Sequence, residues 1–408
     1  MKKILRGLSR IIGMASLIVG AESAVVAAQT WSTPQFAATG SIAEAVATNG
    51  QGTSAIVTTG ANVVVQTHGV WSAPVTLSSA TNLEANVAVA PNGDVLAVWS
   101  FRTSNSYLPI TAQAAFYASG KWGRPITLST NVFGNVSSRG LPAIAFDSAS
   151  QANIVWEDVT SASPIACGLK VATGTAASGL GAAQTISTAS TCFGWTRLAL
   201  NESGTAIAVQ GVPGILSGAV VAISRSASGV WSAPVSVAAA GVYRQRQPKV
   251  GLANDGSAVL LWLTNGSVRY AVRANNTWSA PATLPVLIGG AGGAADLAVD
   301  GAGNAVALFT QTGIGAGGYS TFLPAGGTWQ PKLRLPNGSD LNVVASAGGT
   351  FVVGGQTVST RLGGSSVWTS TSFANADSTL VAIGAKQAMV VLEGTPSSQL
   401  LVSTATVP

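Results

Sequence analysis

The chain has 408 residues, of which only 8% are charged and 47% are hydrophobic, and its formal net charge is +6. Without residues 1–28, which hold four basic residues and Glu22, 16 basic and 13 acidic residues remain and the net charge is +3. A balance this close to neutral argues against a nucleic-acid partner, which needs dense basic patches. The high hydrophobic fraction argues against a disordered chain or a charged helical bundle.

Residues 1–28 have the pattern of a secretory signal peptide. Four basic residues within the first ten precede the short apolar run Ile11–Val19, and Val26–Ala28 supplies small residues for cleavage. The apolar run is short for a helix that spans a bilayer, and Glu22 follows it. We therefore expect a secreted or periplasmic protein with one mature domain at 29–408 and no membrane span in that domain.

The remainder of the chain repeats a tryptophan phrase. Gly-Val-Trp-Ser-Ala-Pro-Val stands at Gly69–Val75 and again at Gly229–Val235. Variants of this phrase begin at Trp31, Trp122, Trp278, Trp329 and Trp368, and a worn copy runs from Leu180 to Ile186. A repeat of this length indicates stacked supersecondary units rather than one conventional core.

A second phrase precedes the tryptophan phrase and is clearest at Val87–Trp99. Its copies are Ala45–Val57, Ile144–Trp156, Leu198–Val209, Val250–Trp262, Leu297–Phe309, Val343–Val353 and Val381–Leu392. Alternating apolar residues around a polar or glycine turn predict a β-hairpin, and a third strand follows each hairpin. With the tryptophan phrase as a fourth strand, each unit is expected to be one blade of a β-propeller.

Proline places the tryptophan strand at the outer edge of each blade. It falls three residues after the tryptophan at Pro34, Pro74, Pro125, Pro234 and Pro281. Proline cannot donate a hydrogen bond to a neighbouring strand, so it belongs on an edge, where it also blocks pairing with other molecules. A tryptophan repeated in nearly every unit is expected to pack between blades, although a sugar-stacking role is the alternative.

The two ends of the chain are expected to share a blade. The hairpins and the tryptophan strands each number eight, but the chain opens with a tryptophan strand at Trp31 and closes with the hairpin Val381–Leu392 plus one strand. The sequence therefore predicts an all-β fold, an eight-bladed β-propeller in which the N-terminal strand completes the last blade. Seven blades is the alternative.

The phrase Gly-x-Trp-Ser-x-Pro-Val resembles the tail of the Asp-box, or BNR, repeat of sialidase-like propellers, which runs Ser-x-Asp-x-Gly-x-Thr-Trp. The box is degenerate here, because Ser226–Val230 precedes Trp231 and Asn275–Thr277 precedes Trp278, and neither segment holds an aspartate. The resemblance implies the propeller fold over essentially the whole mature chain. It implies no activity, because the family's arginine triad and nucleophile pair have no matching positions here.

Two cysteines, Cys167 and Cys192, make up the full complement of the chain. In an exported protein an even pair favours a disulfide, which would join the third unit to the start of the fourth. Two buried, unbonded side chains are the alternative.

Long loops and charged residues gather in units two to five, on the face that carries the loops from each outer strand to the next inner strand. Such loops bind ligands in propellers because they vary over a rigid base. The candidate ligand-binding residues are Arg102, Arg139, Glu157, Asp158, Arg197, Tyr243, Arg244 and Arg246. Several arginines at one channel mouth could hold a carboxylate, sulfate or phosphate, whereas the ordinary alternative is that loops simply carry the charges.

Residue types suited to catalysis are scarce. The single histidine, His68, precedes a turn on the opposite face, so we expect no metal site, no cofactor and no Ser–His pair. Glu157 and Asp158 are adjacent and should point to opposite sides of a strand, which makes them a poor acid–base pair. The leading hypothesis is a non-catalytic binding module for a glycan or a protein, met on the loop face of units two to five. A diverged sialidase-like glycoside hydrolase and a structural surface protein are the alternatives.

The nature of the partner should show in the aromatic residues of the loop face. A glycan-binding face should expose some of Phe101, Tyr107, Phe193 and Trp195. If these rings are buried, a protein partner gains over a glycan.

Overall fold

A computed structural model of the chain describes residues 30–39, 42–80, 84–102, 110–133, 140–162, 165–189, 192, 195–211, 219–239, 248–264, 267–285, 291–311, 315–336, 342–355, 357–362, 365, 367–373, 378–394 and 399–407. These residues form strands, turns and irregular segments without a helix. The described part of the chain accordingly contains no helix able to cross a membrane. The proposed signal sequence, residues 1–28, lies outside the described residues.

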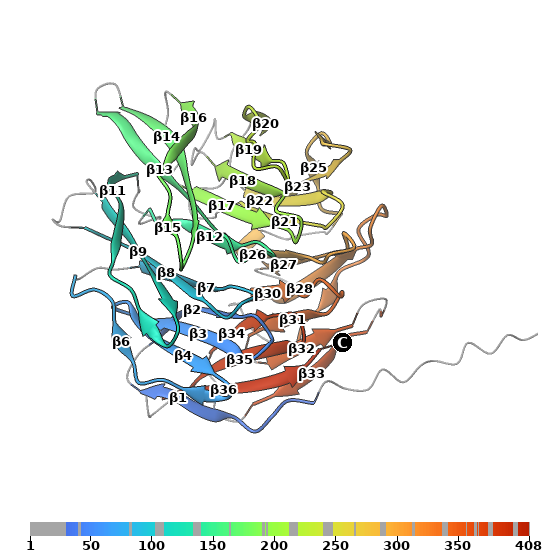
Figure 1. Ribbon diagram of the computed structural model, residues 1–408. Coiled ribbons are helices and arrows are strands. Elements are labelled where there is room, and N and C mark those ends of the chain that lie inside the picture. The colour runs from blue at the N-terminus through green and yellow to red at the C-terminus, as the bar shows by residue number, and fades with distance from the viewer. Residues whose placement is uncertain are drawn as a thin grey trace, which may run out of the picture.

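Antiparallel units of about four strands follow one another along the chain (Figure 1). We number the units from one to eight by their first strands, which are β2 (Ala43–Thr48), β7 (Glu84–Val89), β12 (Ala143–Phe146), β17 (Trp195–Leu200), β21 (Lys249–Leu252), β26 (Ala291–Val299), β30 (Asn342–Ala345) and β34 (Ser378–Ile383). Each first strand contacts the first strand of the next unit, and β34 contacts β2.

The first strand of each unit forms a hairpin with the second, as the repeated phrase predicts. The second strands are β3 (Thr53–Thr58), β8 (Val95–Arg102), β13 (Ala152–Ala162), β18 (Ala206–Gly211), β22 (Ala258–Thr264), β27 (Ala305–Gln311), β31 (Phe351–Gly354) and β35 (Gln387–Gly394). In unit two, Val87 lies opposite Ala97 and Val89 opposite Val95, with the turn at 90–94 between them. The third strands are β4 (Asn62–Thr67), β9 (Ile110–Ala118), β14 (Ile165–Thr175), β19 (Val220–Arg225), β23 (Ser267–Ala274), β28 (Gly317–Leu323), β32 (Thr357–Arg361) and β36 (Gln399–Thr406).

The tryptophan phrases form the outermost strand of each unit, and in four units that strand is broken into two short pieces. The pieces are β5 (Val70–Trp71) and β6 (Val75–Thr76), β10 (Lys121–Trp122) and β11 (Ile126–Val132), β15 (Gly179–Leu180) and β16 (Gln184–Ala189), and β24 (Thr277–Trp278) and β25 (Ala282–Thr283). The other units use β20 (Val235–Ala238), β29 (Leu333–Arg334), β33 (Thr369–Ser372) and β1 (Gln35–Thr39). In three of the broken strands proline lies in the gap, as expected of an edge residue that cannot donate a ladder hydrogen bond.

The serine of the Trp-Ser-Ala-Pro phrase forms hydrogen bonds at this break in the outer strand. The Ser72 hydroxyl accepts a hydrogen bond from Val65 N at 3.1 Å and donates one to Ala73 O at 2.9 Å. Ser232 and Ser279 make the equivalent pairs of bonds in units four and five. The serine thus satisfies a backbone donor of the third strand where the outer strand leaves the ladder.

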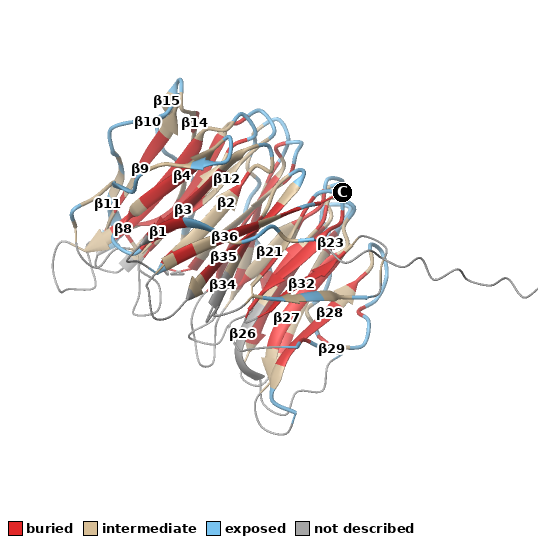
Figure 2. Ribbon diagram, turned by 90° about the horizontal axis from the view of Figure 1, so that it is seen from below, coloured by how far each residue is buried: buried red, intermediate tan, exposed pale blue. Residues whose placement is uncertain are grey.

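Apolar side chains pack between neighbouring units rather than inside any one of them. The described residues form separate hydrophobic clusters, and each cluster takes its members from two adjacent units. One cluster joins unit eight to unit one through Ala38, Ile56, Met389 and Leu400. Figure 2 shows the result, with buried strand centres between exposed turns. Each sheet is therefore covered on both faces by its neighbours.

The repeated tryptophan lies on the side of its sheet that faces the preceding unit. Trp122 of unit two packs against the cluster shared with unit one, and Trp278 of unit five against the cluster shared with unit four. The same holds for Trp71 and Trp329. The prediction that these side chains pack between blades is confirmed.

The two ends of the described chain meet in unit eight. β1 pairs antiparallel with β36, so that Gln35 lies opposite Val402, and the blue and red ends lie together in Figure 1. Ser32 N donates to Thr404 O at 2.8 Å, and the Ser403 hydroxyl donates to Ser32 O at 2.6 Å. The sheet order is β1-β36-β35-β34, which places the N-terminal strand at its outer edge.

Not every unit is a separate sheet. Val132 at the end of β11 pairs with Asp158 of β13, which links units two and three into one ten-stranded sheet. A disulfide joins Cys167 on β14 to Cys192, which lies shortly before β17. It therefore ties the third unit to the segment that enters the fourth.

We expect Ala38→Asp to lower the free energy of unfolding by about 3 kcal/mol, because it places a charge in the cluster between units eight and one. Gln35→Asp, at an exposed position on the same strand, is the matched control and should change stability little. Urea denaturation of both variants measures the difference. Equal losses would show that Ala38 is not part of this packed cluster.

Replacement of both cysteines by serine should lower the free energy of unfolding by about 3 kcal/mol, because the disulfide closes a loop of 25 residues. A reducing agent should shift the denaturation midpoint of the native protein by a similar amount and leave the double variant unchanged. A midpoint of the native protein that does not respond to reductant would rule out the bond.

Candidate functional site

The structure describes four of the eight residues predicted to bind ligand. Arg102 ends β8, Glu157 and Asp158 lie on β13, and Arg197 lies on β17. The other four, Arg139, Tyr243, Arg244 and Arg246, lie outside the described residues. The predicted grouping of arginines therefore stays a prediction.

Glu157 and Asp158 point to opposite sides of β13, as expected for adjacent strand residues. Glu157 accepts a hydrogen bond from Gln210 Nε2 of unit four at 3.4 Å. Asp158 accepts one from Trp156 Nε1 at 3.0 Å and forms an ion pair with Lys170 at 3.0 Å. Both carboxylates are buried, so each one stabilises an interior contact.

Among the described residues, two carboxylates act on the charge of Arg197. Burial lowers the pKa of Arg197, while the negative charges of Asp296 and Glu84 act against that shift. Asp296 also forms an ion pair with Lys249 at 2.9 Å. Because Glu84 and Asp296 belong to units two and six, the charge of Arg197 in unit four interacts with first strands on both sides of it.

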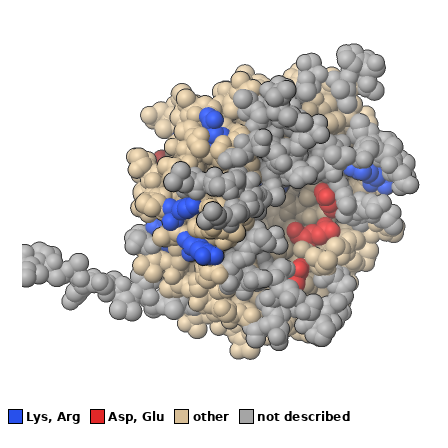
Figure 3. Space-filling view, turned by 180° about the vertical axis from the view of Figure 1, so that it is seen from behind, with Lys and Arg blue, Asp and Glu red and all other residues tan. Residues whose placement is uncertain are grey.

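Side-chain oxygens near the starts of the first strands also bind the backbone of the next unit. Glu393 accepts from Ala43 N at 2.7 Å, and Glu44 accepts from Ala85 N at 2.8 Å. Asp296 does the same for Val343 N at 2.9 Å. Figure 3 shows Asp and Glu side chains gathered in a hollow near the centre of one face. We call Glu44, Glu84, Arg197, Lys249, Asp296 and Glu393 the charged mouth.

The charged mouth is not a metal centre in the described structure. Among the described residues, no group of three or more His, Cys, Asp or Glu side chains is arranged to hold a metal ion. The carboxylates are instead distributed over several units, and each named bond serves a strand of the neighbouring unit.

Two of the four aromatic residues expected on the loop face are described, and one of them is fully buried while the other is partly buried. Trp195 is 1% exposed and belongs to the core between units four and five. Phe101 packs against the core between units one and two. Tyr107 and Phe193 lie outside the described residues. The described aromatics therefore give no support to a glycan site on this face.

A large groove lies instead between units four and five, at the end where the hairpin turns are. Its volume is about 690 Å³. Residues that line it include Ser203, Arg225 and Trp231 from unit four and Asn254, Asp255, Arg273, Asn276 and Trp278 from unit five. We call this the four–five groove. It combines indole rings, hydroxyl and amide groups, and charges of both signs.

Arg273 and Trp278 lie opposite each other at the centre of this arrangement, on the paired strands β23 and β24. Arg273 Nη1 donates to Gly256 O at 2.6 Å, and Nη2 donates to Asn276 Oδ1 at 2.8 Å. Burial lowers the pKa of Arg273. Its side chain lines the groove together with Trp278 and residues of the hairpin turn. In unit four, Arg225 lies opposite Trp231 and donates to Gly204 O at 2.7 Å. The arginines thus hold the hairpin turns that border the groove.

This groove lies at the opposite ends of the first strands from the charged mouth, whereas the charged loops predicted a site on the other face. Its lining includes Ser226 and Asn276, which belong to the degenerate boxes. The sequence does hold a signal for this groove, because an arginine precedes the repeated tryptophan by five to seven residues at Arg225, Arg273 and Arg361. Two of these arginines fall in consecutive units.

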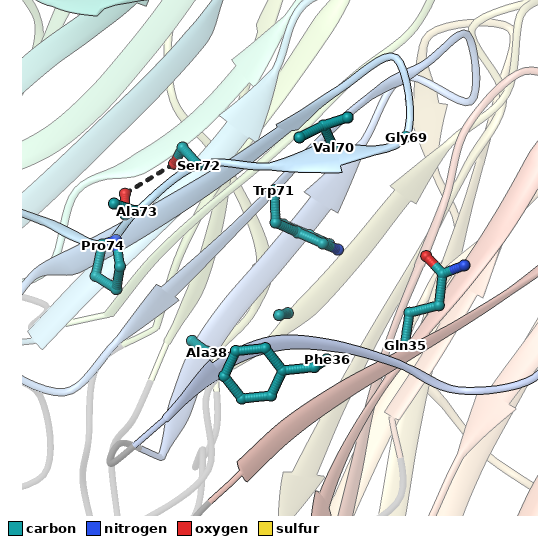
Figure 4. A pocket seen from close by; sticks show the side chains of 10 residues that line it. Gln35, Phe36, Ala38, Gly69, Val70, Trp71, Ser72, Ala73 and Pro74 are labelled. Carbon is teal, nitrogen blue, oxygen red and sulfur yellow. Dashed lines mark hydrogen bonds between the residues drawn. The ribbon is translucent and has the colours of Figure 1, made fainter.

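A second hollow, of about 450 Å³, lies between units eight and one. Figure 4 shows Phe36 of β1 on one side of it and Val70, Trp71 and Pro74 on the other. Phe36 is 53% exposed. The lining of this second hollow holds no charged side chain, so the hollow offers less for specific recognition than the four–five groove does.

No protein-family model matches the sequence, and no curated protein is detectably similar to it. Solved structures are similar in fold. An ulvan lyase, a polysaccharide lyase bound to a saccharide, is 10% identical with a TM-score of 0.50, over 90% of this chain and 95% of that one. YCF48 bound to D1 peptide is 12% identical with a TM-score of 0.49, over 93% and 95% of the two chains.

The NanB sialidase from Streptococcus pneumoniae is 9% identical with a TM-score of 0.42, over 80% of this chain and 68% of that one. Identities this low show the fold alone. The chain has an all-β architecture of the propeller type, and it resembles the sialidase-like β-propeller proteins in fold.

Proposed function

We propose that the protein is a non-catalytic, saccharide-binding β-propeller and that the four–five groove is its binding site. The observation that carries the proposal is the partly exposed indole of Trp278 beside the amide and hydroxyl groups of Asn254, Asn276 and Ser203 in one hollow. Sugars present apolar ring faces and hydroxyl groups together, and such a mixed lining matches both.

The number of carboxylates that line the groove favours binding over hydrolysis. Within its described lining the groove presents one carboxylate, that of Asp255. Glycoside hydrolysis ordinarily uses a pair of carboxyl groups on either side of the scissile bond. We therefore propose binding, and not a diverged glycosidase, as the role of this groove.

We further propose that the units form one closed ring of eight blades in a single exported domain, residues 29–408. The ring is supported by contacts of the first strands from β2 through β34 and back to β2, and by the cluster shared by units eight and one. Export is supported by the pattern of residues 1–28 and by the disulfide, which suits an oxidising compartment. Sequencing of the mature N-terminus should find a start near Gln29.

A glycan array probed with the mature protein tests the saccharide proposal, and tryptophan fluorescence then measures affinity for the glycans found. We expect Trp278→Ala to weaken binding at least tenfold, because truncation removes the apolar platform, and Trp278→Phe to weaken it less. Trp122→Ala removes the repeated tryptophan of unit two, which is also partly exposed. It is the matched control and should bind as the native protein does. Equal losses in both alanine variants would mean that Trp278 acts only through the fold.

A protein partner at the charged mouth is the second candidate. Its support is the hollow with gathered carboxylates, which favours a partner that carries Lys or Arg side chains. A hexa-arginine peptide should bind the protein more tightly than hexa-glutamate does. Its affinity should fall as the salt concentration rises, because salt screens the attraction between charges.

Asp296→Asn should weaken binding of hexa-arginine, because it removes one negative charge from the charged mouth. Asp147→Asn, in a hairpin turn of unit three, is its control. A peptide preference that ignores salt and Asp296 would rule this candidate out.

A further inference from the structure

The saccharide of the four–five groove can be specified further, on the basis of the function proposed above. We infer that it is acidic and carries a carboxylate or sulfate group that the groove places near Arg273 and Arg225. The inference depends on the charges of the lining and on a comparison among the repeats.

The two arginines bring positive charge to the groove without a matching carboxylate. Arg225 is 9% exposed and Arg273 is 5% exposed. Their hydrogen-bond acceptors in the described structure are Gly204 O, Gly256 O and Asn276 Oδ1, all uncharged. Neither arginine forms an ion pair with a described residue.

An anion beside these side chains would be favoured for two physical reasons. Burial disfavours the charged guanidinium of Arg273, as the lowered pKa shows, so a nearby negative charge would recover part of that cost. Guanidinium groups also form strong, charge-assisted hydrogen bonds with carboxylate and sulfate oxygens. The donors that Arg225 and Arg273 do not use on backbone carbonyls could provide such bonds at the groove surface.

The repeat shows that the scaffold does not need an arginine at this position. The residue opposite the tryptophan is Gln66 in unit one and Tyr117 in unit two, and Gly174 lies opposite Leu180 in unit three. In these units the first, second, third and outer strands pair in the same order as in units four and five. Arg361 stands at a similar place in unit seven, but Arg225 and Arg273 belong to consecutive units and border one groove, so one acidic ligand there could contact both.

Asp255 places a negative charge in the groove, which opposes the positive charge of the two arginines and offers a way to test the inference. The side chain is exposed in the groove, and its Oδ1 accepts a hydrogen bond from Ser257 N at 2.8 Å. Hydrogen bonds from Ser257 lower the pKa of Asp255, so it is negatively charged at neutral pH. It lies beyond ion-pair distance of both arginines, and it should repel an acidic ligand.

The first experiment compares acidic glycans with their neutral counterparts on one array. Oligogalacturonides are paired with their methyl esters, and chondroitin sulfate oligosaccharides with desulfated forms. We expect the acidic member of at least one pair to bind about tenfold more tightly, because its charge-assisted hydrogen bonds are lost in the neutral form. Equal binding of both members overturns the inference and leaves the saccharide proposal standing. No binding to any member, and to no other glycan, overturns both.

The second experiment uses variants of the groove and measures affinity for the acidic glycan that binds best. Arg273→Gln should weaken binding of that acidic glycan at least fivefold more than it weakens binding of the neutral counterpart, because the neutral glycan loses no charge-assisted hydrogen bond. Arg361→Gln is the matched control, because Arg361 is also buried and also precedes a repeated tryptophan, Trp368, but it lies in unit seven. It should cost stability without a change in affinity.

Asp255→Asn tests the inference even if the arginine variant fails to fold. The substitution keeps an oxygen for Ser257 N and removes a repelling charge, so acidic glycans should bind about threefold more tightly. A merely structural role of Asp255 would leave affinity unchanged or lower it. Unchanged or weaker binding of the acidic glycan by this variant would contradict the inference.

Discussion

Apolar packing between neighbouring sheets is the interaction on which the rest of this structure depends. Each sheet has two apolar faces, and each face finds its partner on an adjacent unit. No unit can bury its apolar side chains alone, so each unit is stable only when it packs against its neighbours along the chain. The first and last units would each leave one apolar face in water unless they met, and the cluster of Ile56 with Met389 shows that they do meet.

Hydrogen bonds then fix the alignment that apolar packing leaves open. Hydrophobic contact is not directional, whereas a bond such as Glu44 to Ala85 N sets how two first strands lie along each other. At the opposite end, Asn201 Nδ2 donates to Ala253 O at 2.9 Å and connects two hairpin turns. The charged mouth and the hairpin turns therefore hold the same strands at both ends.

Most of the fold could be predicted from the sequence, because repetition multiplies weak signals. One hairpin such as Val87–Trp99 is an uncertain prediction, but several copies at similar spacing limit the fold to few choices. The worn copy at Leu180 was recognisable only through its neighbours, and it does form an outer strand. Proline similarly marked where the outer strands break, because its missing N–H has the same consequence in every unit.

The candidate site was harder to predict, because it arises where two units meet and not within the motif of either. Composition drew attention to charged loops, while Arg225 and Arg273 looked like ordinary ends of strands. Their importance depends on burial and on the lack of an ion pair to any described carboxylate, and neither property can be read from one sequence. Arg197 shows a related difficulty, since its sequence neighbours do not reveal that the negative charges of Asp296 and Glu84 act on it.

The one-way orientation of the repeated tryptophan has a consequence for how such a fold can change. Because the units that carry this residue present it to the unit before them, these junctions share one plan of packing. A junction can then acquire new surface residues without altering how its neighbours fit. The residues of one junction can therefore change during evolution while the packing at the other junctions keeps the fold intact.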